Sequence, residues 1–138
     1  MTGFDSDGGS SEPASIITEK KAVVKESKLA RKKHWDATYK FELENFENNG
    51  DDGGEVWYGK DVQKKTVEYI MEVFCPEIEG SPSLSLLDLG TGNGALLFKL
   101  AKKGIFHKFE SVLMKGVDYS EHSIMFASRV KESLTTSD

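Results

Sequence analysis

One aspartate and three alternating glycines stand out in this 138-residue sequence as residues that could bind a ligand. Asp88 is followed by Gly90, Gly92 and Gly94 in the run Asp-Leu-Gly-Thr-Gly-Asn-Gly. Because glycine has no side chain, a ligand can lie directly against its backbone, which also adopts angles that other residues avoid. A carboxylate beside such a turn attracts a cationic group and repels a phosphate. The residues therefore predict a ligand-binding turn, and the alternative is a glycine turn that holds nothing.

The segments on either side of the turn predict a strand and a helix. Residues 84–89 form a short apolar run bounded by turn-forming residues, which is typical of a buried parallel strand. Residues 95–103 favour a helix that stops at Gly104. The apolar residues on one face of this helix are Leu96, Leu97, Leu100 and Ala101. Strand, glycine turn and helix open a nucleotide-binding α/β fold, whose ligand lies outside the carboxyl ends of the strands.

Two classes of ligand fit this turn. Gly90, Gly92 and Ala95 loosely satisfy a dinucleotide fingerprint, in which a pyrophosphate would sit on the helix N-terminus. S-adenosylmethionine instead suits an acid followed by a complete D-x-G-x-G-x-G run, which is what this sequence has. The carboxylate of Asp88 would oppose a phosphate but would attract the amino group of the methionine moiety. Charge therefore favours S-adenosylmethionine, with an NAD-type ligand as the alternative.

A second acid occupies the position that binds ribose in such folds. The segment that ends at Val117 predicts a second parallel strand, and Asp118 comes directly after it. An acid at this position accepts hydrogen bonds from ribose hydroxyls. The alternative for Asp118 is a helix cap, because a helix is predicted from Ser120 to about Ser133. The predicted buried side of that helix includes Ile124, Met125, Ala127, Ser128 and Val130.

Upstream of the glycine turn, two helices and a loop are predicted. A helix from about Lys28 to Asn48 carries an apolar stripe at helical spacing, formed by Trp35, Tyr39, Leu43 and Phe46. In the loop that follows, Trp57 and Tyr58 either cover a ligand or plug the edge of the core. Asp61 is predicted to cap a second helix that runs to about Phe74 and ends at Cys75-Pro76. Its predicted buried face is Val62, Thr66, Val67, Ile70, Val73 and Phe74.

Composition limits the classes of function. The formal charge of −5 offers no general footprint for nucleic acid, and no apolar run is long enough to span a membrane. The single cysteine, Cys75, excludes an internal disulfide, and no metal site is predicted. The N-terminus lacks the features of a secretory signal, so the cytoplasm is expected, with the nucleus as an additional compartment.

The first segment of the chain differs in composition from the rest. Residues 1–27 are mostly small and polar, which predicts a disordered tail, and residues 28–138 are assigned to the folded domain. The lysines and arginines between residues 20 and 33 have three interpretations. They contact an acidic partner, serve as a nuclear-import signal, or form the solvated start of a helix.

The run Leu-Leu-Asp-Leu-Gly-Thr-Gly-Asn-Gly resembles motif I of the class I, seven-stranded methyltransferases. With Gly-Val-Asp-Tyr-Ser at 116–120, it is closer still to the protein-lysine methyltransferases that modify translation elongation factor 1-alpha. His-Trp-Asp-Ala-Thr-Tyr at 34–39 and Gly-Glu-Val-Trp-Tyr-Gly at 54–59 resemble the N-terminal signatures of that subfamily. The resemblance covers about residues 33–126, and the segment around His107 to Ser111 is longer than is usual there.

The resemblance implies a Rossmann-like, doubly wound parallel sheet, of which this chain would hold the N-terminal part. It also implies S-adenosyl-L-methionine as cofactor and a protein substrate, elongation factor 1-alpha, for an enzyme that is monomeric when complete. The implied cofactor-binding residues are Asp88, Gly90, Thr91, Gly92, Asn93, Gly94, Asp118, Tyr119 and Trp57. The catalytic residues of such enzymes follow later strands, so none is assigned here. The 138-residue chain by itself is expected to be inactive, and a non-catalytic binding fragment is the alternative function.

Overall fold

The computed structural model describes residues 26–50 and 53–136. In chain order the elements are η1 (Lys28–Ala30), α1 (Lys32–Asn49), α2 (Lys60–Glu68), η2 (Tyr69–Phe74), α3 (Cys75–Glu77), β1 (Ser83–Leu89), α4 (Ala95–Lys102), η3 (Ile105–His107), β2 (Ser111–Val117) and α5 (Glu121–Thr135). The tail predicted over residues 1–27 lies outside the described residues except for its last two. Of these, Ser27 accepts a hydrogen bond from the backbone N–H of Leu29 and so caps η1.

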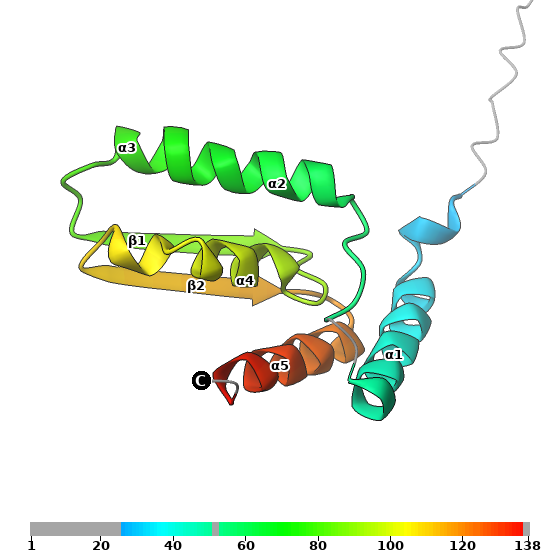
Figure 1. Cartoon of the computed structure of the whole chain (residues 1–138). Coiled ribbons are helices and arrows are strands. Elements are labelled where there is room, and N and C mark those ends of the chain that lie inside the picture. Colours follow the sequence, from blue (N-terminus) through cyan, green and yellow to red (C-terminus); the bar gives the residue numbers. More distant parts are fainter. Residues whose placement is uncertain (1–25, 51–52, 137–138) are drawn as a thin grey trace, which may run out of the picture.

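The two strands pair in parallel and are joined through α4, as predicted for the opening of a doubly wound α/β fold. Their register places Leu84 beside Val112 and Leu89 beside Val117, so both strands end at one edge. Figure 1 shows α4 lying along this pair, and α1 beyond the ends to which the arrowheads point. Asp118 and the glycine turn therefore leave the sheet side by side, close to α1.

One face of the strand pair is covered by helices and builds the larger apolar cluster. Side chains alternate along β1, so Leu84 and Leu86 face inward while Leu87 and Leu89 are exposed. The buried members of this cluster, here called the sheet cluster, are Val67, Cys75, Leu84, Leu100 and Ile105. It joins α2, α4 and the strands, and it thereby fixes the elements on either side of the glycine turn.

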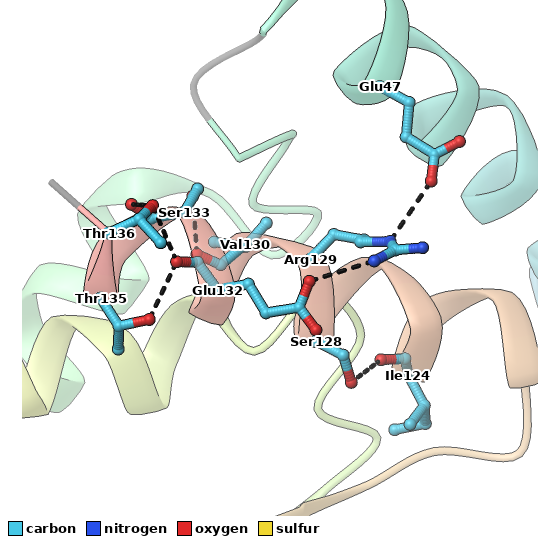
Figure 2. Close-up of polar contacts among 9 residues, drawn as sticks. All are labelled: Glu47, Ile124, Ser128, Arg129, Val130, Glu132, Ser133, Thr135 and Thr136. Carbon is cyan, nitrogen blue, oxygen red and sulfur yellow. Dashed lines mark hydrogen bonds and ion pairs between the residues drawn. The ribbon is translucent and has the colours of Figure 1, made fainter.

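A second apolar cluster joins α1 to α5. Its buried members, here called the α1–α5 cluster, are Tyr39, Leu43, Phe126 and Val130. Trp35, Phe46 and Phe98 pack against it, so the stripe predicted on the first helix is confirmed. At the rim, Arg129 Nε lies 3.4 Å from Glu47 Oε1, and its Nη1 lies 3.1 Å from Glu132 Oε2, as Figure 2 shows. This cluster places an early helix beside the last one.

The predicted helix over residues 61–74 is present, but its start and its end are wrong and its buried face is only partly right. It begins at Lys60 after Gly59, without a side-chain cap from Asp61, and it continues through Pro76 to Glu77. The turn over Tyr69–Phe74 is π-helical, with more residues per turn, which moves the later side chains away from the face expected of a regular helix. Val73 and Phe74, which lie in this turn, are therefore exposed. Val62 is exposed as well and Gln63 is buried in its place, whereas Val67 is buried, and Thr66 and Ile70 half-buried, as predicted.

The predicted buried side of the last helix is also partly wrong. Ile124, Met125 and Ser128 are exposed, and the stripe that faces inward consists of Ser123, Phe126 and Val130. Phe126 has no exposed surface because α1 packs over it, a contact that periodicity within the helix did not reveal. The segment after α4 holds η3, whose Ile105 is fully buried, before β2 begins at Ser111. No helix in the described ranges is long and apolar enough to cross a membrane.

Candidate functional site

An open cavity of about 190 Å³ lies at the carboxyl ends of the two strands. Its walls come from α1, from the loop before α2, from the glycine turn and from the segment after β2. The lining residues are Trp35, Tyr39, Glu55, Val56, Trp57, Tyr58, Gly90, Thr91, Gly92, Asn93, Ala95, Asp118 and Tyr119. Seven of the nine residues predicted to bind the cofactor line this one cavity; Asp88 and Gly94 do not.

The backbone of the glycine turn is bare at Gly90. Gly90 has a φ of 74°, and a Cβ placed on it would meet no atom within 4 Å. The backbone N–H groups of Gly90 and Thr91 both donate to the carbonyl oxygen of Val117, at 2.9 and 3.0 Å. These bonds fasten the turn to the end of β2. Gly90 therefore offers a fixed stretch of main chain against which a ligand can lie.

The other two glycines make room for protein side chains. A Cβ on Gly92, whose φ is 57°, would collide with the Tyr39 hydroxyl. A Cβ on Gly94, the residue before α4, would lie 2.9 Å from the ring of Phe98. The alternating glycines thus serve two purposes: Gly90 and Gly92 line the cavity, while Gly92 and Gly94 also leave room for the side chains of Tyr39 and Phe98.

The first acid of the motif is engaged within the turn. Thr91 Oγ1 donates to Asp88 Oδ2 at 2.8 Å, and Asp88 is half-buried at the end of β1. The same Thr91 side chain lies over Gly116, where a Cβ would come within 2.6 Å of Thr91 Oγ1. Asp88 therefore braces the turn in this structure, and its predicted contact with a cationic ligand group stays a prediction.

The second acid, Asp118, lines the cavity and is held from both sides. Its Oδ2 accepts the backbone N–H of Gly92 at 2.9 Å, and its Oδ1 accepts that of Ser120 at 2.9 Å. A carboxylate offers about four acceptor positions, so two remain for hydroxyl groups of a ligand. The capping role and the ribose role are thus compatible. Tyr119, the next residue, lines the cavity with half of its side chain exposed.

Aromatic residues form the wall opposite the glycine turn. Trp35 stacks on Tyr39 with ring centroids 6.1 Å apart, and it meets Trp57 edge to face at 5.3 Å. The indole of Trp35 is fixed because its Nε1 donates to the carbonyl of Leu29 at 2.8 Å. Burial, with Asp118 and Glu42 nearby, raises the pKa of Tyr39 well above its usual range, so its hydroxyl stays protonated. Burial also raises the pKa of Tyr58.

Trp35, Tyr39 and Tyr58 also line the cavity. The sequence leaves Tyr58 open between covering a ligand and plugging the core edge, and it predicts Trp35 and Tyr39 only as part of an apolar stripe. Trp35 and Tyr39 do pack in the core, and they face the cavity as well. The available signal was the aromatic character of the stripe, since Trp and Tyr combine a large apolar body with a polar tip. Within the described residues, no group of three or more His, Cys, Asp or Glu side chains could hold a metal ion.

The comparisons with known proteins agree with this geometry. Residues 81–137, which contain both strands and the glycine turn, match a family model described as a methyltransferase domain. The chain is 38% identical over 113 residues to protein-lysine N-methyltransferase EFM4 of Saccharomyces cerevisiae, a match that covers 81% of this chain and 47% of the yeast protein. It is 34% identical over 106 residues to EEF1A lysine methyltransferase 2 of Homo sapiens, covering 77% and 40%. No solved structure matched the chain.

The strand, glycine turn and helix, together with these matches, place the chain among the class I methyltransferases. Within that class its similarity is to the EFM4 proteins of two yeasts and to EEF1A lysine methyltransferase 2 of Homo sapiens. The chain spans about half the length of the yeast relatives, 47% and 48%, and 40% of the human protein.

Proposed function

We propose that this chain binds S-adenosylmethionine in the cavity beside Gly90 and forms the cofactor-binding part of a protein-lysine N-methyltransferase whose substrate is elongation factor 1-alpha. The observation that carries the proposal is the meeting of Gly90, Asp118 and Trp57 at one cavity, at the carboxyl ends of two parallel strands. The substrate is inferred from the names of the relatives, which are a protein-lysine methyltransferase and EEF1A lysine methyltransferases.

The residues that line the cavity fit such a cofactor. The bare backbone at Gly90 leaves open space that a side chain would fill. The Asp118 carboxylate keeps acceptor positions for ribose hydroxyls, and Trp57 offers an aromatic face that is 44% exposed. When bound, S-adenosylmethionine would supply a methyl group on a sulfonium, which a neutral amine can attack. The role of this part of the protein is to orient the cofactor and shield it from water.

Ligand titration tests the first half of the proposal. The chain has two tryptophans, Trp35 and Trp57, and both line the cavity, so their fluorescence reports on binding directly. S-adenosylhomocysteine should change this fluorescence with saturable affinity, and NAD should not. Replacing Gly90 with Val fills the space beside the backbone and should weaken binding at least tenfold.

Gly80 provides a matched control for that variant. It also has a positive φ, 92°, and open space around its Cβ position, but it lies before β1 and away from the cavity. Gly80→Val therefore introduces similar backbone strain without obstructing the ligand. Equal affinities in the Gly90→Val and Gly80→Val variants would remove Gly90 from the site.

The second half of the proposal concerns methyl transfer. A lysine amine must lose its proton before it attacks, and no residue of this chain is assigned to that step. The expectation that the 138-residue chain by itself is inactive stays a prediction, as does its location in the cytoplasm. Incubating the chain with labelled S-adenosylmethionine and elongation factor 1-alpha tests whether it transfers a methyl group to this substrate. Label above the level of a Gly90→Val sample would overturn the prediction of inactivity.

A further inference from the structure

We infer that Asn93 is a positioning residue, whose side-chain amide clamps the segment 53–58 onto the glycine turn and so holds Trp57 and Tyr58 at the cavity. The effect of this clamp on the cofactor rests on the function proposed above; the clamp itself does not. The family resemblance implied instead that Asn93 binds the cofactor together with the other residues of the turn.

The hydrogen bonds of Asn93 are directed into the protein. Its Nδ2 donates to the carbonyl of Gly53 at 2.9 Å and to the carbonyl of Glu55 at 3.1 Å. Its Oδ1 accepts the backbone N–H of Ala95, the first residue of α4, at 3.3 Å. Both amide hydrogens are therefore used, and the side chain is 5% exposed. Nothing remains for Asn93 to donate to a ligand.

The segment 53–58 is shaped to receive this amide. Gly53 and Gly54 both have positive φ, 94° and 85°, which bends the chain so that carbonyls two residues apart reach one side chain. Gly54 is also enclosed, because a Cβ there would lie 2.5 Å from Glu42 Oε2 and 2.7 Å from the ring of Phe126. One side of the segment thus rests on the α1–α5 cluster, and Asn93 fastens it to the turn.

The clamp positions the aromatic side chains of Trp57 and Tyr58 at the cavity. Trp57 and Tyr58 lie two and three residues after the second clamped carbonyl, and each keeps nearly half of its surface exposed. Trp57 meets Trp35 edge to face, and the N–H of Gly59 closes the loop on the carbonyl of Val56 at 2.9 Å. An aromatic loop with this much exposed surface gains little from burial, so hydrogen bonds at its base contribute strongly to its position.

Replacing Asn93 with Asp separates the two ends of the clamp. An aspartate keeps an oxygen that can accept the N–H of Ala95, so the start of α4 is preserved. It loses both donors and sets a negative charge against the carbonyls of Gly53 and Glu55, so the segment 53–58 is released. Asn48→Asp adds the same charge at an exposed position on α1 and is the matched control.

The experiment measures release of the segment and ligand affinity on the full chain. Chymotrypsin cleavage after Trp57 or Tyr58, mapped by mass spectrometry, should be at least tenfold faster in Asn93→Asp than in the wild type or Asn48→Asp. Cleavage after Phe74, within the helical segment, should be unchanged. Affinity for S-adenosylhomocysteine should fall at least tenfold. Asn93→Ser is the second variant, for use if Asn93→Asp does not fold. Its hydroxyl can accept from Ala95 but cannot span both carbonyls, so the same faster cleavage and weaker binding are expected.

The outcomes separate the clamp from its alternatives. Unchanged cleavage at Trp57 and Tyr58 in both variants overturns the clamp. Weaker binding together with unchanged cleavage would return Asn93 to the role of a direct ligand contact, and this also overturns the inference. If the wild type binds no S-adenosylhomocysteine, the proposed function fails, whereas the cleavage rates still decide whether Asn93 holds the segment.

Discussion

The sheet cluster and the α1–α5 cluster hold different elements of the same cavity in place. The sheet cluster is built mainly from residues 67–105, and it holds the strand, turn and helix that surround Gly90. The α1–α5 cluster joins residues 39–43 to residues 126–130 and brings the aromatic wall across to that turn. Tyr39 belongs to both the second cluster and the cavity wall.

The glycine turn is built from residues closer together in the sequence than those that build the aromatic wall. The glycine turn is shaped by hydrogen bonds to its neighbouring strand, such as those from Gly90 and Thr91 to Val117. The aromatic wall depends on a contact between two helices distant in the sequence: Phe46 and Phe126, 80 residues apart, pack with ring centroids at 5.6 Å. Disturbing each cluster separately should therefore have different effects on stability and on binding.

The largest effect is expected from Phe126→Ala. Phe126 is fully buried in the α1–α5 cluster, and Phe-to-Ala changes at such sites cost about 3–5 kcal/mol of unfolding free energy. Because Gly54 and α1 both rest on this ring, the variant should also lose affinity for S-adenosylhomocysteine in the molecules that remain folded. Urea unfolding and fluorescence titration measure the two effects. Affinity equal to that of the wild type, after correction for unfolded protein, would show that the wall forms without this cluster.

A similar but slightly smaller loss of stability is expected from Leu100→Ala. Leu100 is fully buried in the sheet cluster, where a Leu-to-Ala change costs about 2–5 kcal/mol. It does not line the cavity, so affinity among the folded molecules should stay within about twofold of the wild type, a difference of roughly 0.4 kcal/mol. The test is the contrast with Phe126→Ala. If Leu100→Ala weakens binding as much as Phe126→Ala does, the α1–α5 cluster has no special role in positioning the aromatic wall.

Asp118→Ala should weaken binding more than it weakens the fold. Loss of a charged acceptor for ribose hydroxyls should cost about 1.5–3 kcal/mol, which is roughly ten- to hundredfold in affinity for S-adenosylhomocysteine. The variant also frees the N–H groups of Gly92 and Ser120, so its unfolding free energy must be measured alongside. Asp118→Asn keeps one acceptor and should lie between the two proteins. Affinity within twofold of the wild type in Asp118→Ala would leave Asp118 with its capping role alone.

The smallest effect concerns an exposed ion pair at the start of α1. Lys32 Nζ lies 2.7 Å from Asp36 Oδ2, and this hydrogen bond is the main cause that lowers the pKa of Asp36 below its ordinary 3.8. Stability from a lowered carboxyl pKa is present above the unfolded value and is lost as pH falls through the folded one. The Tm difference between wild type and Asp36→Asn should therefore shrink as pH drops from about 6 to about 2. A constant difference would mean that the charge of Asp36 does not stabilise α1.

The sequence alone was sufficient for the features that depend on neighbouring residues. The strand before Asp88, the glycine turn after it and the helix up to Lys102 are encoded within about 20 residues, and all three elements were predicted. The burial expected of the whole strand is wrong, because Leu87 and Leu89 are exposed. The end of β2 at Val117, directly before Asp118, was also predicted. Such features depend on strand alternation, on helical spacing and on the backbone freedom of glycine, which can be read from a short window.

Only the tertiary structure decided which partner each of these residues meets. Gly92 lines the cavity as expected, but it also makes room for Tyr39, and Asn93 turns toward carbonyls 38 and 40 residues earlier in the chain. Phe126 is buried because α1 covers it, which no pattern within α5 indicated. The physical reason is that burial and hydrogen bonding depend on which segments pack against each other. These segments are far apart in the sequence, so a local periodic pattern does not reveal their contacts.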